Sequence, residues 1–130
     1  MTTLNDGTSM PDSPDVPLLD VVVVKQGDAV VLEVSGEVDM ATAPRLPTHV
    51  LEAIDTRPMV LVIDLAAVHF FGSSGLAVLV DAQQESDAQT QLRIVASRAD
   101  VLRPLQVTGL DKALALYATR EDAVRDAATE

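Results

Sequence analysis

The 130-residue sequence has no cysteine and no tryptophan, and only two phenylalanines and one tyrosine. The absence of cysteine excludes disulfides, thiolate chemistry and cysteine-ligated zinc. The scarcity of aromatic rings leaves few side chains on which nucleic-acid bases could stack. Basic residues are also few, nine Lys and Arg against twenty Asp and Glu, so the net charge is −11. A field of this sign repels phosphate backbones and anionic lipids, and we expect no nucleic-acid or membrane partner.

Long apolar runs are missing as well. No segment approaches the roughly 18 to 20 consecutive apolar residues that a membrane-spanning helix needs. Residues 1–20 contain no basic residue and no apolar core typical of a signal peptide. We therefore expect a cytoplasmic protein, with a monomer as the simplest state for so acidic a surface.

Apolar residues nevertheless make up 48% of the chain, and most of them are Val, Leu, Ile and Ala. Such residues are typical of a parallel or mixed sheet covered by helices. The length suits one domain with a substantial core. Residues 1–17 are polar and contain three prolines, so we expect a disordered leader there and a single domain at 18–130.

The apolar patterns predict strands at 18–24, 29–34, 60–63, 91–96 and 114–117, and helices that begin near residues 42, 73, 97 and 119. Three strand–helix–strand crossovers require mainly parallel pairing, whereas the short turn between the first two strands predicts an antiparallel hairpin. We therefore predict an α/β fold with a mixed four- to five-stranded β-sheet and about four packed α-helices. Ser97 is the expected cap of the third helix, and Pro104 should kink that helix or end it early.

The stretch Phe71-Gly-Ser-Ser-Gly75 separates the central strand from the second helix and places two hydroxyls between glycines. The start of a helix presents free backbone N–H groups and the positive end of the helix dipole. One interpretation is that Ser73 only caps this helix, because serine is among the commonest N-cap residues. The other is that Ser73 carries a phosphate, which such a position stabilises. The residues alone leave both open.

Catalytic and cofactor sites match the sequence poorly. The spacing differs from the G-x-S-x-G nucleophile elbow, so a serine hydrolase that uses Ser73 with His69 ranks last among the alternatives. Neither common phosphate-loop motif is present. Asp39 and Asp64 could each face the turn, but two carboxylates make no metal motif. We expect no catalytic residue, no metal and no cofactor.

Three segments occur in an order that resembles the STAS domain of anti-sigma factor antagonists, also called anti-anti-sigma factors. They are Gly36-Glu-Val-Asp39, the run from Asp64 to Leu76 that contains Phe-Gly-Ser-Ser-Gly, and Thr108-Gly-Leu110. The family pattern is roughly G-E-[LV]-D, then D-[LV] and F-[ML]-D-S-[ST]-G-L, then [ST]-G-L. The central motif is the specific one, and the resemblance extends over about residues 18–126.

The resemblance implies a regulatory binding protein in a bacterial partner-switching circuit, not an enzyme. In that family, a partner that is both anti-sigma factor and serine kinase phosphorylates the first serine of the central motif. By this resemblance Ser73 is the acceptor and Ser74 the second choice. The unphosphorylated form binds the anti-sigma factor and frees a sigma factor, and phosphorylation releases the partner. The partner-binding residues implied are Glu37, Asp39, Thr42, Gly72, Ser73, Ser74, Gly75 and Leu76.

The chain departs from the family at Gly72, where the family usually has aspartate. The missing carboxylate removes a local feature that a kinase could read. It therefore favours an alternative, a STAS module that senses a small ligand (a nucleotide or a lipid) or binds a partner without phosphorylation. Asp39 is expected near the turn, where it would oppose a phosphate on Ser73.

Overall fold

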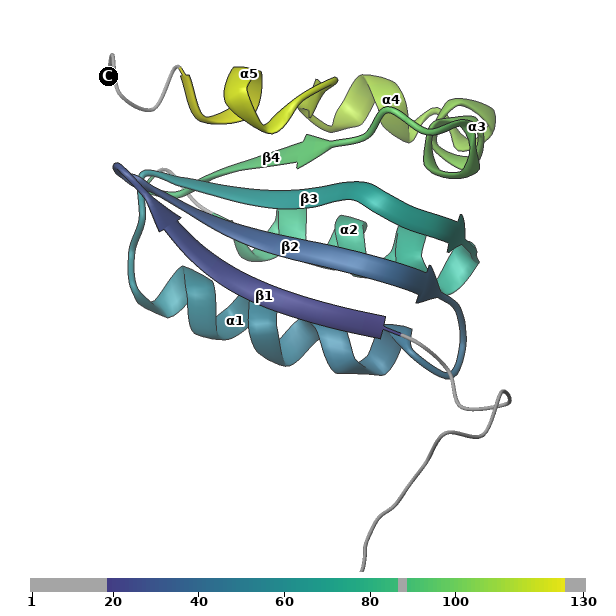
Figure 1. Ribbon diagram of the computed structural model, residues 1–130, viewed down its shortest axis with the longest axis horizontal. Helices are drawn as coiled ribbons and strands as arrows, with labels where there is room; N and C mark the ends of the chain where they lie inside the picture. Colours follow the sequence, from purple (N-terminus) through teal and green to yellow (C-terminus); the bar gives the residue numbers. More distant parts are fainter. Residues whose placement is uncertain (1–18, 87–88, 126–130) are drawn as a thin grey trace, which may run out of the picture.

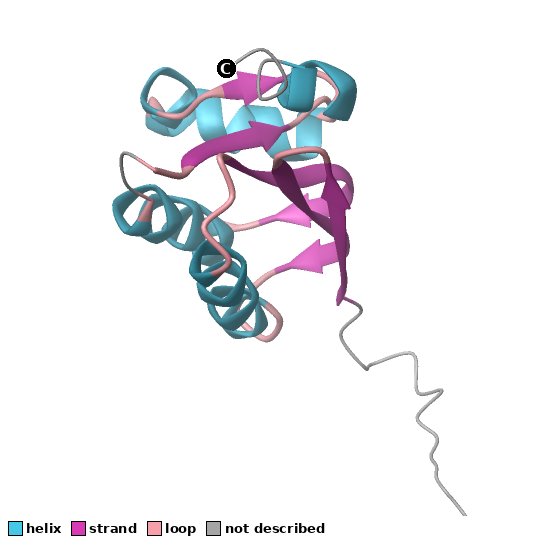
Figure 2. Ribbon diagram, turned by 90° about the vertical axis from the view of Figure 1, so that its left-hand side faces the viewer, coloured by secondary structure: helices cyan, strands magenta, loops and turns pink. Residues whose placement is uncertain are grey.

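The computed structural model describes residues 19–86 and 89–125, in which a five-stranded sheet has helices on both faces (Figures 1 and 2). The predicted leader, residues 1–17, lies outside the described residues. The elements follow in this order: β1 (Leu19–Gln26), β2 (Ala29–Val38), a 3₁₀ turn η1 (Ala43–Arg45), α1 (Leu46–Asp55), β3 (Val60–Phe71), α2 (Ser73–Glu85), β4 (Gln91–Val95), α3 (Ala99–Thr108), α4 (Leu110–Ala113), β5 (Leu116–Tyr117) and α5 (Arg120–Arg125).

The strands lie side by side in the order β1-β2-β3-β4-β5. β1 and β2 pair antiparallel across a turn in which Gly27 has a φ of +62°, a conformation that glycine adopts without strain. The other three pairs are parallel. The predicted mixed α/β fold with one antiparallel hairpin is therefore confirmed.

Two apolar cores lie on opposite faces of the sheet. The larger one packs β2 and β3 against the helices, with Leu32, Ile63, Leu79 and Leu105 all buried. The smaller one lies beneath α5, where Ala123 packs on valines from the first halves of β2 and β3. Further along the same two strands, several residues are exposed: Glu37, Ala66, Ala67, His69 and Phe70.

Both central strands extend further than the sequence predicted. β2 continues to Val38 rather than ending at Val34, and β3 continues to Phe71 rather than ending at Ile63. The added residues of β2 and β3 pair with each other in parallel, and the register shifts between Glu33 and Ser35 and again between Gly36 and Glu37. Because β3 ends at Phe71, only Gly72 separates this strand from the first residue of α2 (Figure 1).

The helices begin and end with small departures from expectation. The N-cap of α3 is Arg98, not Ser97. Pro104 does not end the helix, which continues to Thr108 and is followed by its C-cap Gly109, a residue in the left-handed conformation. The short α4 was not predicted. The predicted cap at Thr119 is confirmed, since its hydroxyl accepts the Asp122 backbone N–H at 3.1 Å.

Arg120 attaches α5 to the sheet. Its Nε donates to Asp64 Oδ2 at 3.0 Å, and its guanidinium also pairs with Glu33. Burial alone would lower the pKa of Arg120, but the hydrogen bonds and the attraction of both carboxylates raise it overall. Asp64 therefore faces α5, and the expectation that it faces the strand-to-helix turn is wrong. Within the described residues, no helix is long and apolar enough to cross a membrane.

Candidate functional site

Ser73 is the first residue of α2 and is separated from the end of β3 by Gly72 alone. The N-cap is Gly72, in an extended conformation, so the interpretation that Ser73 caps the helix is wrong. The Gly72 carbonyl accepts the backbone N–H groups of Gly75 and Leu76 at 3.0 and 3.2 Å. The Gly72 N–H donates to the Val38 carbonyl at 2.9 Å, which fixes the turn against the end of β2.

The Ser73 side chain is exposed, and that of Ser74 is half-buried. Neither hydroxyl makes a hydrogen bond to another residue in the part of the chain that the structure describes. Both residues occupy the first turn of α2, where a helix presents backbone N–H groups without intrahelical partners. The Ser73 oxygen is therefore accessible, and it is not engaged in holding the helix.

The loop after β2 is shaped by hydrogen bonds between Asp39 and Thr42. Asp39 Oδ1 accepts the backbone N–H groups of Ala41 at 2.9 Å and of Thr42 at 3.1 Å. Thr42 Oγ1 accepts the Asp39 backbone N–H at 3.0 Å and donates to the Glu37 carbonyl at 2.7 Å. These bonds close the loop into a tight turn with Met40 and Ala41 at its tip.

An open depression of about 460 Å³ lies between this loop and the start of α2. Two large apolar side chains line it while remaining exposed, Met40 at 83% and Phe70 at 52%. Exposed apolar side chains that gather at one place mark an interaction site more often than scattered ones do. The full lining is Asp39, Met40, Ala41, Phe70, Gly72, Ser73 and Ser74.

Gly72 allows the ring of Phe70 to lie against the turn. A Cβ on Gly72 would be 3.2 Å from Phe70 Cε2, closer than ordinary van der Waals contact. The backbone at Gly72 has a φ of −94°, which any residue adopts. The glycine is therefore significant for the space it leaves beside Phe70 rather than for its backbone conformation.

Gly75 brings α2 close to the sheet. A Cβ on Gly75 would lie 2.7 Å from Phe71 Cε1 and 2.8 Å from Val38 Cγ1, and both of these side chains are buried. Only glycine fits at this distance. The close approach places Ser73 beside the loop that follows β2.

Most of the predicted partner-binding residues lie in or next to this depression. Glu37 is exposed and is the register partner of Phe70 in the β2–β3 ladder. Thr42 is 1% exposed and Gly75 is buried, so these two support the surface from below and offer no side chain for contact. Leu76 is half-buried against the larger core.

The sequence analysis missed three residues that line the depression, Met40, Ala41 and Phe70, of which Met40 and Phe70 are large and apolar. Phe70 was visible as one of only two phenylalanines. That its side chain is exposed could not be predicted, because the sequence did not indicate that β3 continues past Ile63. Met40 carries no sequence signal of its own, because a methionine in a loop is as easily buried as exposed.

The site gives little support to the two alternative chemistries, a serine hydrolase and a metal site. His69 is exposed on β3 and does not line the depression. No hydrogen bond joins it to Ser73 or to a carboxylate within the described residues, as a hydrolase triad requires. In the same residues, no group of three or more His, Asp and Glu side chains gathers where it could hold a metal ion.

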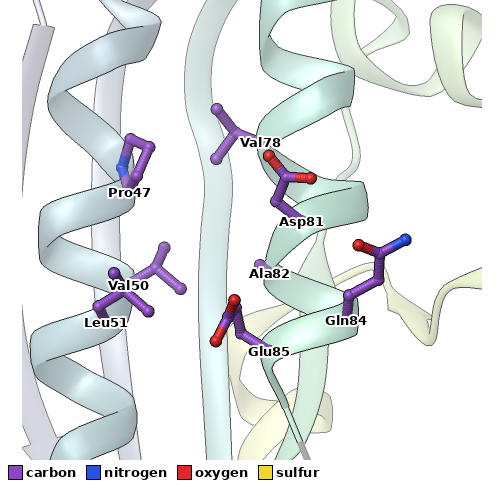
Figure 3. Close-up of a pocket in the computed structure, with 8 residues that line it drawn as sticks. All are labelled: Pro47, Val50, Leu51, Val78, Asp81, Ala82, Gln84 and Glu85. Atoms are coloured by element: carbon purple, nitrogen blue, oxygen red, sulfur yellow. The ribbon is translucent and has the colours of Figure 1, made fainter.

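A second, smaller groove of about 190 Å³ lies between α1 and α2 (Figure 3). Pro47, Val50 and Leu51 reach toward it from α1, while Val78, Asp81 and Glu85 reach toward it from α2. Ligand pockets generally occupy about 300 to 1,000 Å³. This groove is therefore too small to enclose a nucleotide or a lipid.

The sequence matches the STAS domain family over residues 20–123, so the chain belongs to that family. It is 35% identical over 116 residues to the anti-sigma-F factor antagonist RsfB of Mycobacterium tuberculosis (strain CDC 1551 / Oshkosh), an alignment that covers 89% of this chain and 91% of that protein. The resemblance inferred from the three motifs is confirmed.

Solved structures agree with this assignment. The crystal structure of an anti-sigma factor antagonist from Mycobacterium paratuberculosis has a TM-score of 0.82 to this chain, with 37% identity, and the match covers 89% of this chain and 97% of that one. The anti-sigma factor antagonist SpoIIAA in its unphosphorylated form shares the fold, with a TM-score of 0.65, 20% identity and coverage of 87% and 98%.

Proposed function

We propose that this chain is an anti-sigma factor antagonist regulated by phosphorylation of Ser73. In its unphosphorylated form it binds an anti-sigma factor that is also a serine kinase, and this binding frees a sigma factor. The relatives named as antagonists, at 35% and 37% identity, support the antagonist role. Because sigma factors act on RNA polymerase, the proposed function implies action in the cytoplasm.

The observation that carries the switch is the position of Ser73. Its side chain is exposed at the first residue of α2, in a depression that also holds Met40 and Phe70. A kinase can reach such a hydroxyl without unfolding the helix. Because the partner is itself the kinase, covering the depression brings its ATP to this hydroxyl, and the resulting phosphate lies within the surface that binding covers.

The chemistry requires only an acceptor oxygen from this chain. The Ser73 oxygen forms a bond to the γ-phosphorus of ATP, the bond to the ADP oxygen breaks, and the hydroxyl proton passes to a base of the kinase. The chain is therefore a substrate and a binding partner, and we propose no enzymatic activity of its own.

Phosphorylation adds about −1.5 to −2 charges at pH 7. In the free protein, the N–H groups at the start of α2 and the helix dipole stabilise this charge. In a complex, the same phosphate would lose its hydration against the partner, which is costly unless new hydrogen bonds form. The difference between the two environments favours dissociation, and no refolding is needed.

The acceptor is tested by incubating the chain with its cognate anti-sigma factor kinase and ATP, and then locating the phosphate by mass spectrometry. We expect phosphate on the wild type and on Ser74→Ala, and none on Ser73→Ala. A pull-down with the same kinase in the absence of ATP should retain the wild type and lose Ser73→Glu. Equal phosphorylation of Ser73→Ala and wild type would contradict the assignment.

The small-ligand alternative has weaker support. The groove between α1 and α2 is below the usual size of a ligand pocket, and the depression at Ser73 has no lysine or arginine in its lining to hold a phosphate or an anionic lipid. Native mass spectrometry of the purified protein tests it directly. A retained nucleotide or lipid would favour the sensor over the switch.

A further inference from the structure

We propose that Met40 and Phe70 are the apolar contacts by which the anti-sigma factor kinase holds this chain. This inference rests on the proposed function and adds to it the residues that provide binding energy. The occupant is the kinase, presenting at this place an apolar surface bordered by basic side chains.

The first argument is where the exposed apolar side chains lie. In the described part of the chain, the large apolar residues that remain exposed are Val22, Val23, Met40, Leu51, Met59, Phe70 and Val107. Of these, only Met40 and Phe70 line the depression that contains Ser73. They come from different segments, the loop after β2 and the end of β3, and they meet only through the fold.

The second argument is that the two side chains are presented by an ordered frame. The Asp39–Thr42 hydrogen bonds fix the loop that carries Met40. The space left by Gly72 lets the Phe70 ring lie against the turn. A contact surface that is already organised loses less conformational entropy on binding, so more of its apolar burial becomes affinity.

The third argument identifies the occupant. A kinase that phosphorylates Ser73 must bring the γ-phosphate of ATP to the Ser73 oxygen, and it must therefore cover the depression. The Asp39 carboxylate lines the depression, and Glu37 is exposed beside Phe70 in the register of the sheet. With a chain of net charge −11, the complementary surface is basic around an apolar centre.

This arrangement also explains how the phosphate acts. Ser73 lies in the same depression as the two apolar side chains, so its phosphate enters the part of the interface that binding would desolvate. A dianion at the rim could remain hydrated and would weaken binding little. A dianion between the apolar contacts cannot remain hydrated while they are covered.

The test measures the dissociation constant for the cognate anti-sigma factor kinase without ATP, by isothermal titration calorimetry. We expect Met40→Ser and Phe70→Ser each to weaken binding by about thirtyfold or more, the range of interface hot spots. Val107→Ser and Leu51→Ser are the matched controls, because these residues are 79% and 46% exposed and lie outside the depression. The controls should bind like the wild type.

Two readouts separate this inference from the function on which it rests. In steady-state phosphorylation, Met40→Ser should raise KM for the protein substrate with little change in kcat, as expected when uniform binding is lost. If the wild type binds and is phosphorylated on Ser73 while both serine variants bind like the wild type, the inference is wrong and the switch stands. If the wild type neither binds nor is phosphorylated, the proposed function itself fails.

Folding of the variants is checked by circular dichroism. Met40 is 83% exposed, so its truncation leaves the core intact. If Phe70→Ser is unstable, Phe70→Leu takes its place, with a smaller loss of affinity expected because a branched aliphatic side chain still offers apolar area. Wild-type affinity in Phe70→Leu together with Met40→Ser would overturn the inference.

Discussion

Thr42 Oγ1 lies 3.2 Å from Asp39 Oδ1 in the loop that presents Met40. The same hydroxyl oxygen accepts the Asp39 backbone N–H and donates to the Glu37 carbonyl. Because Thr42 is only 1% exposed, water cannot easily replace these bonds. The buried Thr42 hydroxyl therefore holds the loop together with the Asp39 carboxylate.

Replacing Thr42 by valine keeps the side-chain volume and removes the hydroxyl. We expect the free energy of unfolding to fall by about 1–3 kcal/mol, because buried backbone groups lose their partner. Urea denaturation followed by circular dichroism measures this change. Thr48→Val, at an exposed position of α1, is the control, with an expected change within about 0.5 kcal/mol. Equal effects of the two variants would show that the hydroxyl does not support the loop.

Replacing Gly75 by alanine should destabilise the domain by about 1–3 kcal/mol, the usual cost of overpacking. The new Cβ would lie 2.8 Å or less from buried atoms of Phe71 and Val38, and neither side chain can move into solvent. Gly72→Ala is the matched control, because its Cβ approaches closely only the exposed Phe70 ring, with the Val38 carbonyl oxygen at an ordinary 3.7 Å, and a loss below about 1 kcal/mol is expected. Chemical denaturation distinguishes the two. If Gly75→Ala were the milder variant, the close packing of α2 on the sheet would be in doubt.

Removing the charge of Arg120 should loosen α5. Arg120→Met leaves the Asp64 side chain, 10% exposed, without its cationic partner, and we expect a loss of about 1–3 kcal/mol in the free energy of unfolding. Arg125→Met is the control, since its pair with Asp122 is exposed and such pairs contribute about 0–1 kcal/mol. Similar stability of the two variants would contradict the role given to Arg120.

The pH dependence of that effect follows from the raised pKa of Arg120. A raised pKa in the folded state contributes stability at every pH below the unfolded value and loses it only as the pH rises through the folded value. We therefore expect the difference between the wild type and Arg120→Met to stay constant between about pH 7 and pH 10, far below the range in which arginine titrates. A difference that shrinks within this interval would mean that another group carries the effect.

The sequence predicted the fold class because its apolar runs and glycine turns are local signals. It failed where tertiary environment overrides local pattern. Asp64 and His69 interrupt the apolar run, yet β3 continues through them to Phe71. Asp64 is paired with Arg120 of α5, and His69 is exposed, so neither polar side chain is buried without a partner. The same reasoning applies to β2, which continues through Ser35 and Glu37 to Val38.

At the site, the residues alone predicted the strand-to-helix turn, and the resemblance to STAS domains singled out Ser73 as the acceptor. The interpretation that Ser73 is the N-cap is wrong, because Gly72 holds that position, and the exact start of a helix depends on how the preceding strand ends. The apolar partners of Ser73 were not predictable from local pattern. Met40 and Phe70 are 30 residues apart in the chain, and their exposure at one depression is a property of the assembled fold.

The central claim is that a phosphate on Ser73 abolishes partner binding while the fold is retained. The most direct measurement compares the affinity of the cognate anti-sigma factor for this protein before and after phosphorylation of Ser73, with circular dichroism of both forms. We predict binding about a hundredfold weaker or more for the phosphorylated form, a difference of about 2.7 kcal/mol or more, and superimposable spectra. Equal affinity of the two forms would contradict the account.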